Sequence, residues 1–250
     1  MIYFTGDTHG DLDINKIFPN SLRMRGITVT DKDHILIAGD FGLPFLTEEA
    51  ESFEQGDGGT YGFCLNRLSV LPCKILWIDG NHENHDWWAQ QPVTEMFGGR
   101  VQIHPHSQQI IHLMRGEVYE IDGRTLFTFG GAVSVDKEYR TEGYSWWAAE
   151  QASDEDIANA EKNLDRVGRK VDFIVTHTMP MSIIKREGWE PVPDRGADYL
   201  DKVMHTVEFK AWVCGHFHVD RLPGNNICML YNEVVSADTI ESILERRKGY

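Results

Sequence analysis

The sequence "KILWIDGNHE" (residues 74–83) joins a short apolar run to a dense group of polar side chains. The run "KILWI" has the length and composition of a buried β-strand. It stops at Asp79-Gly80, and residues 81–85 are two asparagines, two histidines and a glutamate. A polar turn before a capped helix would also account for this segment, with His82 and His85 as ordinary surface residues. The rest of the chain favours a functional interpretation.

Four further apolar runs end in polar residues of the same kinds. They are "IYFT" followed by "GDTHG" (residues 2–10), "HILIA" followed by "GDFG" (34–42), "VDFIV" followed by "TH" (171–177) and "AWVC" followed by "GHFH" (211–218). None of the five runs alternates strictly between apolar and polar residues. This pattern indicates strands that are covered on both faces, as in a sheet flanked by helices.

Helices are predicted between these runs, at residues 11–18, 61–70, 153–167 and 198–205. In the third of them Ser153 is the expected N-cap, with Asp156 three residues later, and an apolar stripe follows at helical spacing. Strands that alternate with helices are typical of an α/β fold. The sequence therefore predicts an α/β architecture.

Short β-type runs replace this pattern between residues 101 and 135 and again near residues 225–235. Asp122-Gly123 is a hairpin sequence, and Asn225-Asn226 precedes the second β-rich block. We expect two sheets, one built from the strand-helix units and one partly antiparallel, in a single domain that spans residues 1–250. Loop or cap elaborations are expected near residues 44–60 and 84–156.

The composition narrows the range of functions. The chain has 250 residues, with 24 Lys and Arg against 39 Asp and Glu, so its formal net charge is −15. This charge disfavours binding to long nucleic acids or to anionic membranes. No apolar run approaches the roughly 18–20 residues that span a bilayer, and no P-loop is present. Four widely spaced cysteines without a C-x-x-C pair suggest reduced thiols, so a cytoplasmic protein is expected.

The polar strand ends are expected to converge, because ligands in α/β sheets bind beyond the carboxyl ends of the strands. If the five runs are neighbours, they bring together two carboxylates, one amide and five imidazoles, from Asp7, His9, Asp40, Asn81, His82, His177, His216 and His218. These groups are the ligand types of Mn, Fe, Zn and Ni. Seven donors suit two ions that share a carboxylate at roughly 3.5–4 Å separation, the spacing used for displacement at phosphorus.

The ordered motifs "GDTHG", "GDFG", "GNHE", "THTMP" and "GHFH" resemble those of the calcineurin-like metallophosphoesterases. They occur in that family's order and extend over nearly the whole chain. The resemblance implies a sandwich of two β-sheets flanked by helices, with a two-metal site at the carboxyl ends of the strands. It implies one metal on Asp7, His9, Asp40 and His218, and a second on Asp40, Asn81, His177 and His216, with Asp40 as the bridge.

The same resemblance implies hydrolysis of a phosphodiester or a phosphomonoester by attack of a metal-bound hydroxide. His82 would face the substrate, as a general acid or as a stabiliser of charge on the leaving oxygen. Two divalent ions are expected, with Mn preferred and Fe, Zn or Ni as alternatives. The expected substrate is a small phosphorylated molecule, nucleotide-like ones included, and neither a long nucleic acid nor a membrane.

The second motif departs from one branch of the family. The Ser/Thr protein phosphatases usually carry an additional Asp and Arg where this chain reads "GDFGLPF". The missing Arg would be a phosphate clamp, and Arg115 and Arg140 are the candidates to replace it. A Ser/Thr-type protein phosphatase and a non-catalytic metal-binding scaffold on the same fold are the alternative functions.

Overall fold

Three of the apolar runs form neighbouring parallel strands, β1 (Ile2–Thr5), β2 (His34–Ile37) and β3 (Lys74–Trp77), in the computed structural model, which describes residues 1–45 and 59–247. Antiparallel strands extend this sheet at both edges. The full seven-stranded order is β13 (Val235–Ser236), β1, β2, β3, β6 (Ser107–Leu113), β5 (Gly99–His104) and β4 (Val93–Met96).

The other two runs belong to a second, six-stranded sheet. Its order is β11 (Arg221–Gly224), β12 (Ile227–Met229), β10 (Glu208–Cys214), β9 (Lys170–Thr176), β8 (Arg124–Phe129) and β7 (Glu117–Ile121). The prediction that one sheet holds all the strand-helix units is therefore wrong, because β9 and β10 lie apart from β1–β3 and both sheets mix parallel and antiparallel pairs. Strand pairing across long stretches of chain leaves no local pattern in the sequence.

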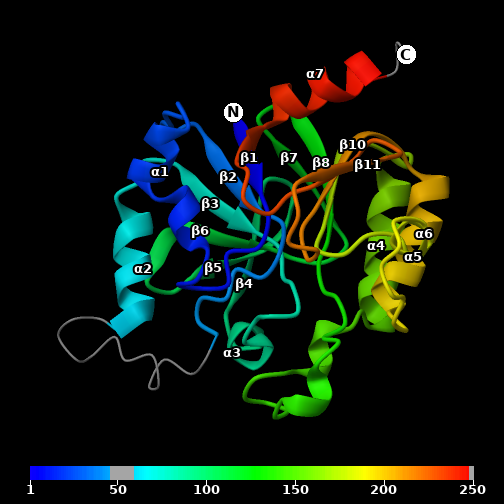
Figure 1. Cartoon of the computed structure of the whole chain (residues 1–250), viewed down its shortest axis with the longest axis horizontal. Coiled ribbons are helices and arrows are strands. Elements are labelled where there is room, and N and C mark those ends of the chain that lie inside the picture. The colour runs from blue at the N-terminus through cyan, green and yellow to red at the C-terminus, as the bar shows by residue number, and fades with distance from the viewer. Residues whose placement is uncertain (46–58, 248–250) are drawn as a thin grey trace.

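The two sheets pack face to face, and helices cover their outer faces (Figure 1). Successive side chains of a strand point to opposite faces. Leu36 and Leu76 accordingly lie in the core between the sheets, whereas Ile35 and Ile75 pack under the helices of the first sheet. Both faces of these strands are buried, which explains the continuous apolar runs. The predicted sandwich of two sheets flanked by helices is confirmed.

The helices divide between the two outer faces (Figure 1). The first sheet is covered by α1 (Pro19–Met24) and α2 (Gly59–Ser69), with α3 (His85–Ala89) beyond the end of β3; the second is covered by α4 (Asp154–Arg166), α5 (Met181–Arg186) and α6 (Arg195–Thr206). The C-terminal helix α7 (Ala237–Arg247) packs Ile240 and Leu244 against the core between the sheets. In the part of the chain that the structure describes, no helix is long and apolar enough to cross a membrane.

Most local predictions are confirmed, and one is corrected. Ser153 caps α4 through a reciprocal capping box with Asp156. Residues 11–18 do not form a helix; they contain only a 3₁₀ turn, η1 (Ile14–Ile17), and α1 starts afterwards. Pro19 separates the 3₁₀ turn from α1, because a residue before proline is pushed out of the helical region, and Phe18 is extended at φ −66° and ψ 152°.

Hairpin turns appear where the sequence indicates them. Asp122 and Gly123 have φ angles of 52° and 72°, and Asn225 and Asn226 have φ angles of 53° and 57°. Two successive left-handed residues are the backbone of the tight turns that match the twist of paired strands. These turns join β7 to β8 and β11 to β12.

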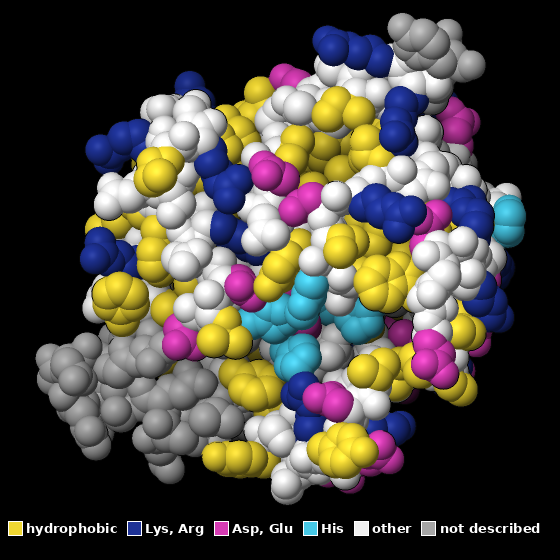
Figure 2. Space-filling view, in the orientation of Figure 1, with side chains coloured by type: hydrophobic (Ala, Val, Ile, Leu, Met, Phe, Trp, Pro, Cys, Tyr) yellow, Lys and Arg dark blue, Asp and Glu magenta, His cyan; other side chains and the backbone are white. Residues whose placement is uncertain are grey.

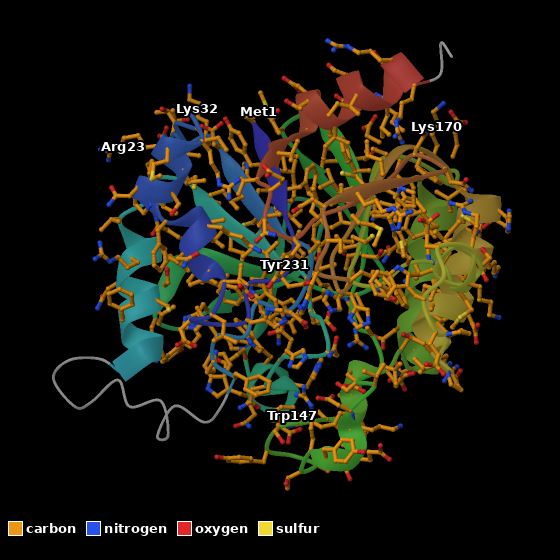
Figure 3. The ribbon with its side chains drawn as sticks, in the orientation of Figure 1. Met1, Arg23, Lys32, Trp147, Lys170 and Tyr231 are labelled. Atoms are coloured by element: carbon orange, nitrogen blue, oxygen red, sulfur yellow. The ribbon has the colours of Figure 1, made fainter. Side chains whose placement is uncertain are left out.

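The expected elaborations fall differently from their predicted ranges. Of residues 44–60, the stretch 46–58 lies outside the described residues. Of residues 84–156, the stretch 93–129 supplies β4 to β8 of the two sheets. The irregular part is the segment 131–152, with two 3₁₀ turns, η2 (Lys137–Tyr139) and η3 (Ala148–Glu150). Trp147 on this segment donates from its indole nitrogen to Asp86 of α3 at 3.0 Å, and Figure 3 shows its position.

Candidate metal centre

The carboxyl ends of β1, β2 and β3 meet those of β9 and β10 along one side of the sandwich. His177, which follows β9, crosses to the first sheet, where its Nδ1 lies 2.8 Å from the carbonyl oxygen of Ala38. The backbone N–H of His216, beyond β10, donates to Asp7, which follows β1, at 2.9 Å. Figure 2 shows a patch of histidine side chains near the middle of the view. The two sheets therefore build the site together.

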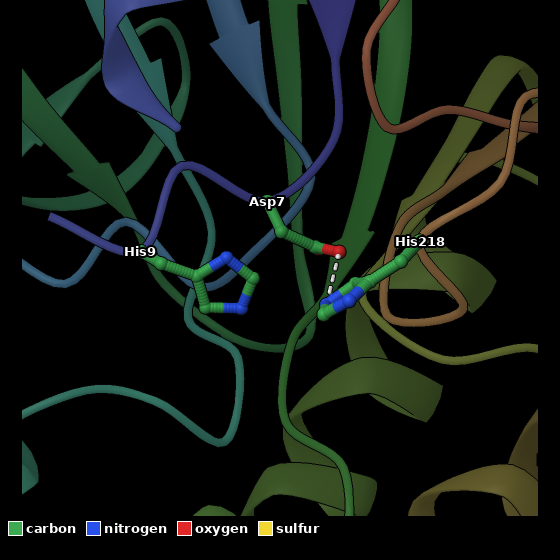
Figure 4. A group of neighbouring side chains, drawn as sticks. All are labelled: Asp7, His9 and His218. Carbon is green, nitrogen blue, oxygen red and sulfur yellow. Dashed lines mark ion pairs between the residues drawn. The ribbon is translucent and has the colours of Figure 1, made fainter. Parts of the chain in front are cut away.

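Asp7 and Asp40 lie at the centre of the group, and both are buried. His177 lies between them, with Nδ1 3.5 Å from Asp7 Oδ1 and Nε2 3.3 Å from Asp40 Oδ1. His9 Nε2 is 3.2 Å from Asp40 Oδ2, and His218 Nε2 is 3.4 Å from Asp7 Oδ2 (Figure 4). The half-exposed His218 ring, stacked on Tyr231 at 4.6 Å, opens the group to solvent.

Asn81 and His216 complete the predicted set. The side-chain oxygen of Asn81 lies 3.1 Å from His177 Nε2, and the His216 ring centre lies 4.9 Å from that of His177. Ligand-type atoms lie within 4.8 Å of one another in three sets: Asp7 with His9 and His218, Asp7 with Asp40 and His177, and His9 with Asp40 and His82. The structure thus brings all seven predicted donors, and His82, into one group.

The charges of this group suit bound cations. Burial raises the pKa of Asp7 above its usual range. Burial acts in the same direction on Asp40, but the charge of His177 and the hydrogen bonds from His177 and His9 outweigh it and hold the pKa of Asp40 well below its usual range. Two buried carboxyl groups so close together need positive charge beside them, which in this structure comes from His177 and His9. Divalent cations would also supply it, and the carboxylate, imidazole and amide donors fit them.

His82 lies beside this group and meets Arg140. Its backbone N–H donates to Asp40 Oδ1 at 2.7 Å, and its ring centre is 5.3 Å from that of His9. The Nη1 of Arg140 is 3.2 Å from His82 Nδ1, and its Nε donates to Asp136 at 2.7 Å. The structure therefore identifies Arg140 as a neighbour of the His82 ring.

Arg115 is not placed as a clamp for an external phosphate. Its buried guanidinium forms a salt bridge with Asp79 and donates to the carbonyl oxygens of residues 149–151. Internal acceptors thus occupy its N–H groups. The interpretation of Arg115 as a substrate-binding residue has no support in this geometry, because a phosphate would have to displace these partners.

The sequence reasoning missed several residues that hold the group in place. Asp13 accepts from His9 at 2.9 Å, and Glu83 accepts from the backbone N–H groups of Phe41 and Gly42 at 2.7 and 2.9 Å. Glu83 thereby fixes the turn after β2 against the turn after β3. The signal for Glu83 was present in the motif "GNHE", and Asp13 follows His9 by four residues in "THGDLD".

The turns that carry the group are strained. His9, Asp40, His216 and His218 have φ angles of 43°, 50°, 68° and 51°. A residue with a Cβ rarely adopts such a left-handed conformation, and the surrounding structure must impose it. Four of the seven predicted donors have this backbone conformation. Strain concentrated in this way is typical of a functional site.

Gly80→Ala should destabilise the protein through a direct collision with Asp40. A Cβ at Gly80 would lie 2.0 Å from Asp40 Oδ1 and 2.4 Å from its backbone nitrogen, which cannot move aside. We expect a loss of roughly 1–3 kcal/mol in the free energy of unfolding, as for other overpacked sites. Urea unfolding measures it. Gly196→Ala, whose nearest neighbour would be 3.2 Å away, is the control, and equal stability of the two variants would contradict the prediction.

In a comparison with known protein families, a model described as calcineurin-like phosphoesterase matches residues 1–220, a range that contains every member of the group. The chain belongs to the calcineurin-like phosphoesterase family. The predicted family is confirmed. A comparison of the phosphoesterase with curated proteins finds no match.

Among solved structures, the phosphoesterase is similar to a Staphylococcus aureus protein provisionally described as a 5'-nucleotidase, in complex with alpha-ketoglutarate. The two chains are 11% identical, with a TM-score of 0.48. The alignment covers 98% of this chain and 58% of the other. The phosphoesterase therefore spans less than two thirds of that protein's length.

Proposed function

We propose that the phosphoesterase hydrolyses a small phosphodiester, or less readily a phosphomonoester, at a centre of two divalent metal ions. The proposed ligands are Asp7, His9, Asp40 and His218 for one ion and Asp40, Asn81, His177 and His216 for the other. The observation that carries the proposal is the position of Asp40, buried between His9 on one oxygen and His177 on the other. Mn is the preferred ion, with Fe, Zn or Ni as alternatives.

The bound ions would neutralise the phosphoryl oxygens and lower the pKa of a bound water. The chain's own contribution lies in His82. Its backbone is fixed by the hydrogen bond to Asp40, while its ring remains partly exposed beside the group. From this position His82 would deliver a proton to the leaving oxygen or stabilise the charge that develops there.

Arg140→Ala should weaken substrate binding, because Arg140 is the cation nearest to His82 and would contact the phosphate. Hydrogen bonds to charged groups contribute roughly 1.5–3 kcal/mol, which corresponds to an increase in KM of about 10- to 150-fold. We expect kcat to fall less than KM rises. Steady-state kinetics on both ester types measures the two constants. Arg186→Ala removes an exposed arginine that contacts Pro223 and Asn225, and it is the control. An unchanged KM in Arg140→Ala would remove Arg140 from the substrate site.

The proposed substrate is small because a net charge of −15 disfavours long polyanions. Nucleotides and similar molecules fit this description. A cytoplasmic location is part of the proposal, supported by four widely spaced cysteines that are all buried and form no disulfide.

The test of the function combines metal content with two model substrates. Chelator-treated protein is reloaded with Mn²⁺, its metal content is measured, and hydrolysis of bis-p-nitrophenyl phosphate and p-nitrophenyl phosphate is followed. Two ions per chain and faster turnover of the diester support the proposal. Folded protein that binds no Mn²⁺ would contradict the metal centre. Two bound ions without turnover of either ester would favour the scaffold alternative. Activity on a phosphopeptide alone would favour the protein phosphatase alternative.

A further inference from the structure

We propose that Ser134 and Glu150 are positioning residues that fix which end of the Asn81 side chain faces the metal centre. This inference rests on the proposed function, in which Asn81 is a metal ligand. An asparagine amide binds a cation through its oxygen, whereas its NH₂ group is a donor. The two ends have nearly the same shape, so something other than packing must choose between them.

Three buried side chains form a chain of hydrogen bonds that makes this choice. Glu150 accepts from the backbone N–H of Ser134 at 2.8 Å and from its hydroxyl at 2.7 Å. The Ser134 hydroxyl oxygen in turn accepts from the Asn81 NH₂ group at 3.2 Å. Asn81, Ser134 and Glu150 are 4%, 2% and 1% exposed, so water does not compete for these bonds.

The direction of these hydrogen bonds follows from the number of protons that the three side chains can donate. An ionised carboxylate only accepts hydrogen bonds, and a serine hydroxyl has a single proton to donate. Because Ser134 gives its proton to Glu150, it has only acceptor capacity left for Asn81. The Asn81 NH₂ group must therefore face Ser134. The amide oxygen is then on the opposite side, where it lies 3.1 Å from His177 Nε2.

Arg115 holds the turn that carries Glu150. Its guanidinium donates to the carbonyl oxygens of Ala149 and Glu150 at 2.9 and 3.1 Å, and its Nε donates to Asp79 at 2.6 Å. Asp79 lies two residues before Asn81 at the end of β3. The segment 131–152 is thus tied to the same strand end at three points, through Arg115, through Ser134 and through the backbone N–H of Gly131, which donates to the carbonyl oxygen of Asp79 at 2.8 Å.

Glu150→Gln tests the inference with almost no change in shape. A glutamine can donate to Ser134, which frees the serine proton to turn toward Asn81 and permits the reversed amide. We expect the affinity for the second Mn²⁺ to fall roughly 10- to 100-fold, as for other residues that orient metal ligands, with the first Mn²⁺ bound as in the wild type. Calorimetric titration of chelator-treated protein with Mn²⁺ measures both affinities without relying on activity.

Two further variants control for folding and for the loss of a hydrogen-bonded carboxylate. Asp172 accepts from the backbone N–H and the hydroxyl of Thr125 at 2.8 and 3.0 Å, the same arrangement at the opposite end of the second sheet. Asp172→Asn should leave both Mn²⁺ affinities unchanged. Ser134→Ala breaks the chain of hydrogen bonds at its middle, so it should lower the affinity for the second Mn²⁺. Adding Glu150→Gln to Ser134→Ala should lower that affinity little further. Thermal unfolding, monitored by circular dichroism, establishes that each variant is folded.

Wild-type affinity for both ions in folded Glu150→Gln and Ser134→Ala would overturn the positioning role and leave the proposed function intact. Asn81→Ala separates the two proposals. If it binds both ions as tightly as the wild type, Asn81 is not a ligand, and the proposed metal assignment is overturned together with this inference. Loss of the second ion in Asn81→Ala and a partial loss in Glu150→Gln supports both.

Discussion

Asp40→Asn is expected to abolish metal-dependent hydrolysis and to reduce the metal content below two ions per chain. Both carboxylate oxygens of Asp40 face imidazoles, at 3.3 Å from His177 and 3.2 Å from His9. Asparagine keeps an acceptor for the backbone N–H of His82 but loses the charge and one of the two oxygens. Loss of an outer-shell partner typically costs roughly 10–100-fold in metal affinity or activity, and loss of a shared ligand should cost more. Elemental analysis and turnover of bis-p-nitrophenyl phosphate measure the two effects.

The same strand offers a matched control. Asp33 lies just before β2, at the end opposite to Asp40, and accepts from the backbone N–H and the hydroxyl of Thr30 at 2.6 and 2.8 Å. Asp33→Asn removes one negative charge from that end of β2 and should retain both metal ions and full turnover. Two ions and wild-type turnover in Asp40→Asn would show that Asp40 is not the shared ligand.

His82→Ala is expected to lower kcat by roughly 10²- to 10⁴-fold, the usual contribution of a general acid, while both metal ions are retained. The reason is the position of His82 beside the carboxylates, with Arg140 on its ring and part of its surface open to a substrate. The same measurements of metal content and turnover that apply to Asp40→Asn distinguish the two residues. Asp40→Asn should lose metal, whereas His82→Ala should keep both metal ions and show only a lower kcat.

Metal content decides the role of His82. One of its ring nitrogens lies within 4.8 Å of ligand-type atoms of His9 and Asp40, close enough for a shared ion. A drop to one ion per chain in His82→Ala would make His82 a ligand and contradict its proposed role as a proton donor. His205→Ala, which removes an exposed histidine at the end of α6, should change neither quantity.

The site could be predicted from the sequence to the extent that it depends on strand ends. Every predicted donor lies within four residues of the end of an apolar run, and the ends of such runs are visible in the sequence as Gly, Asp and His. The hairpin at Asp122-Gly123 and the cap at Ser153 are likewise local, since a few adjacent residues determine them. These features depend on short-range chemistry and need no knowledge of the partner strands.

The remaining features depend on contacts between distant residues. The division of the strands between two sheets, the pairing of Arg140 with His82 across 58 residues, and the bond from Asn81 to Ser134 across 53 residues have no local signature. The left-handed backbone of His9 and His216 is imposed by its surroundings rather than by residue type. Arg115 and Arg140 are the same residue type in the sequence, and only their partners in the fold, Asp79 for Arg115 and His82 for Arg140, separate an internal tie from a candidate substrate contact.

The two-sheet origin of the site has a consequence for how the protein is made. A chain emerges from the ribosome N-terminus first, and its early segments begin to fold as they appear. Asp7 and its backbone partner His216 are separated by 209 residues, so β1, β2 and β3 are exposed long before β9 and β10 exist. With the proposed ligands, a growing chain offers Asp7, His9, Asp40 and Asn81 but lacks His177, His216 and His218. On this proposal, neither metal site has its full set of ligands until the second sheet has packed against the first.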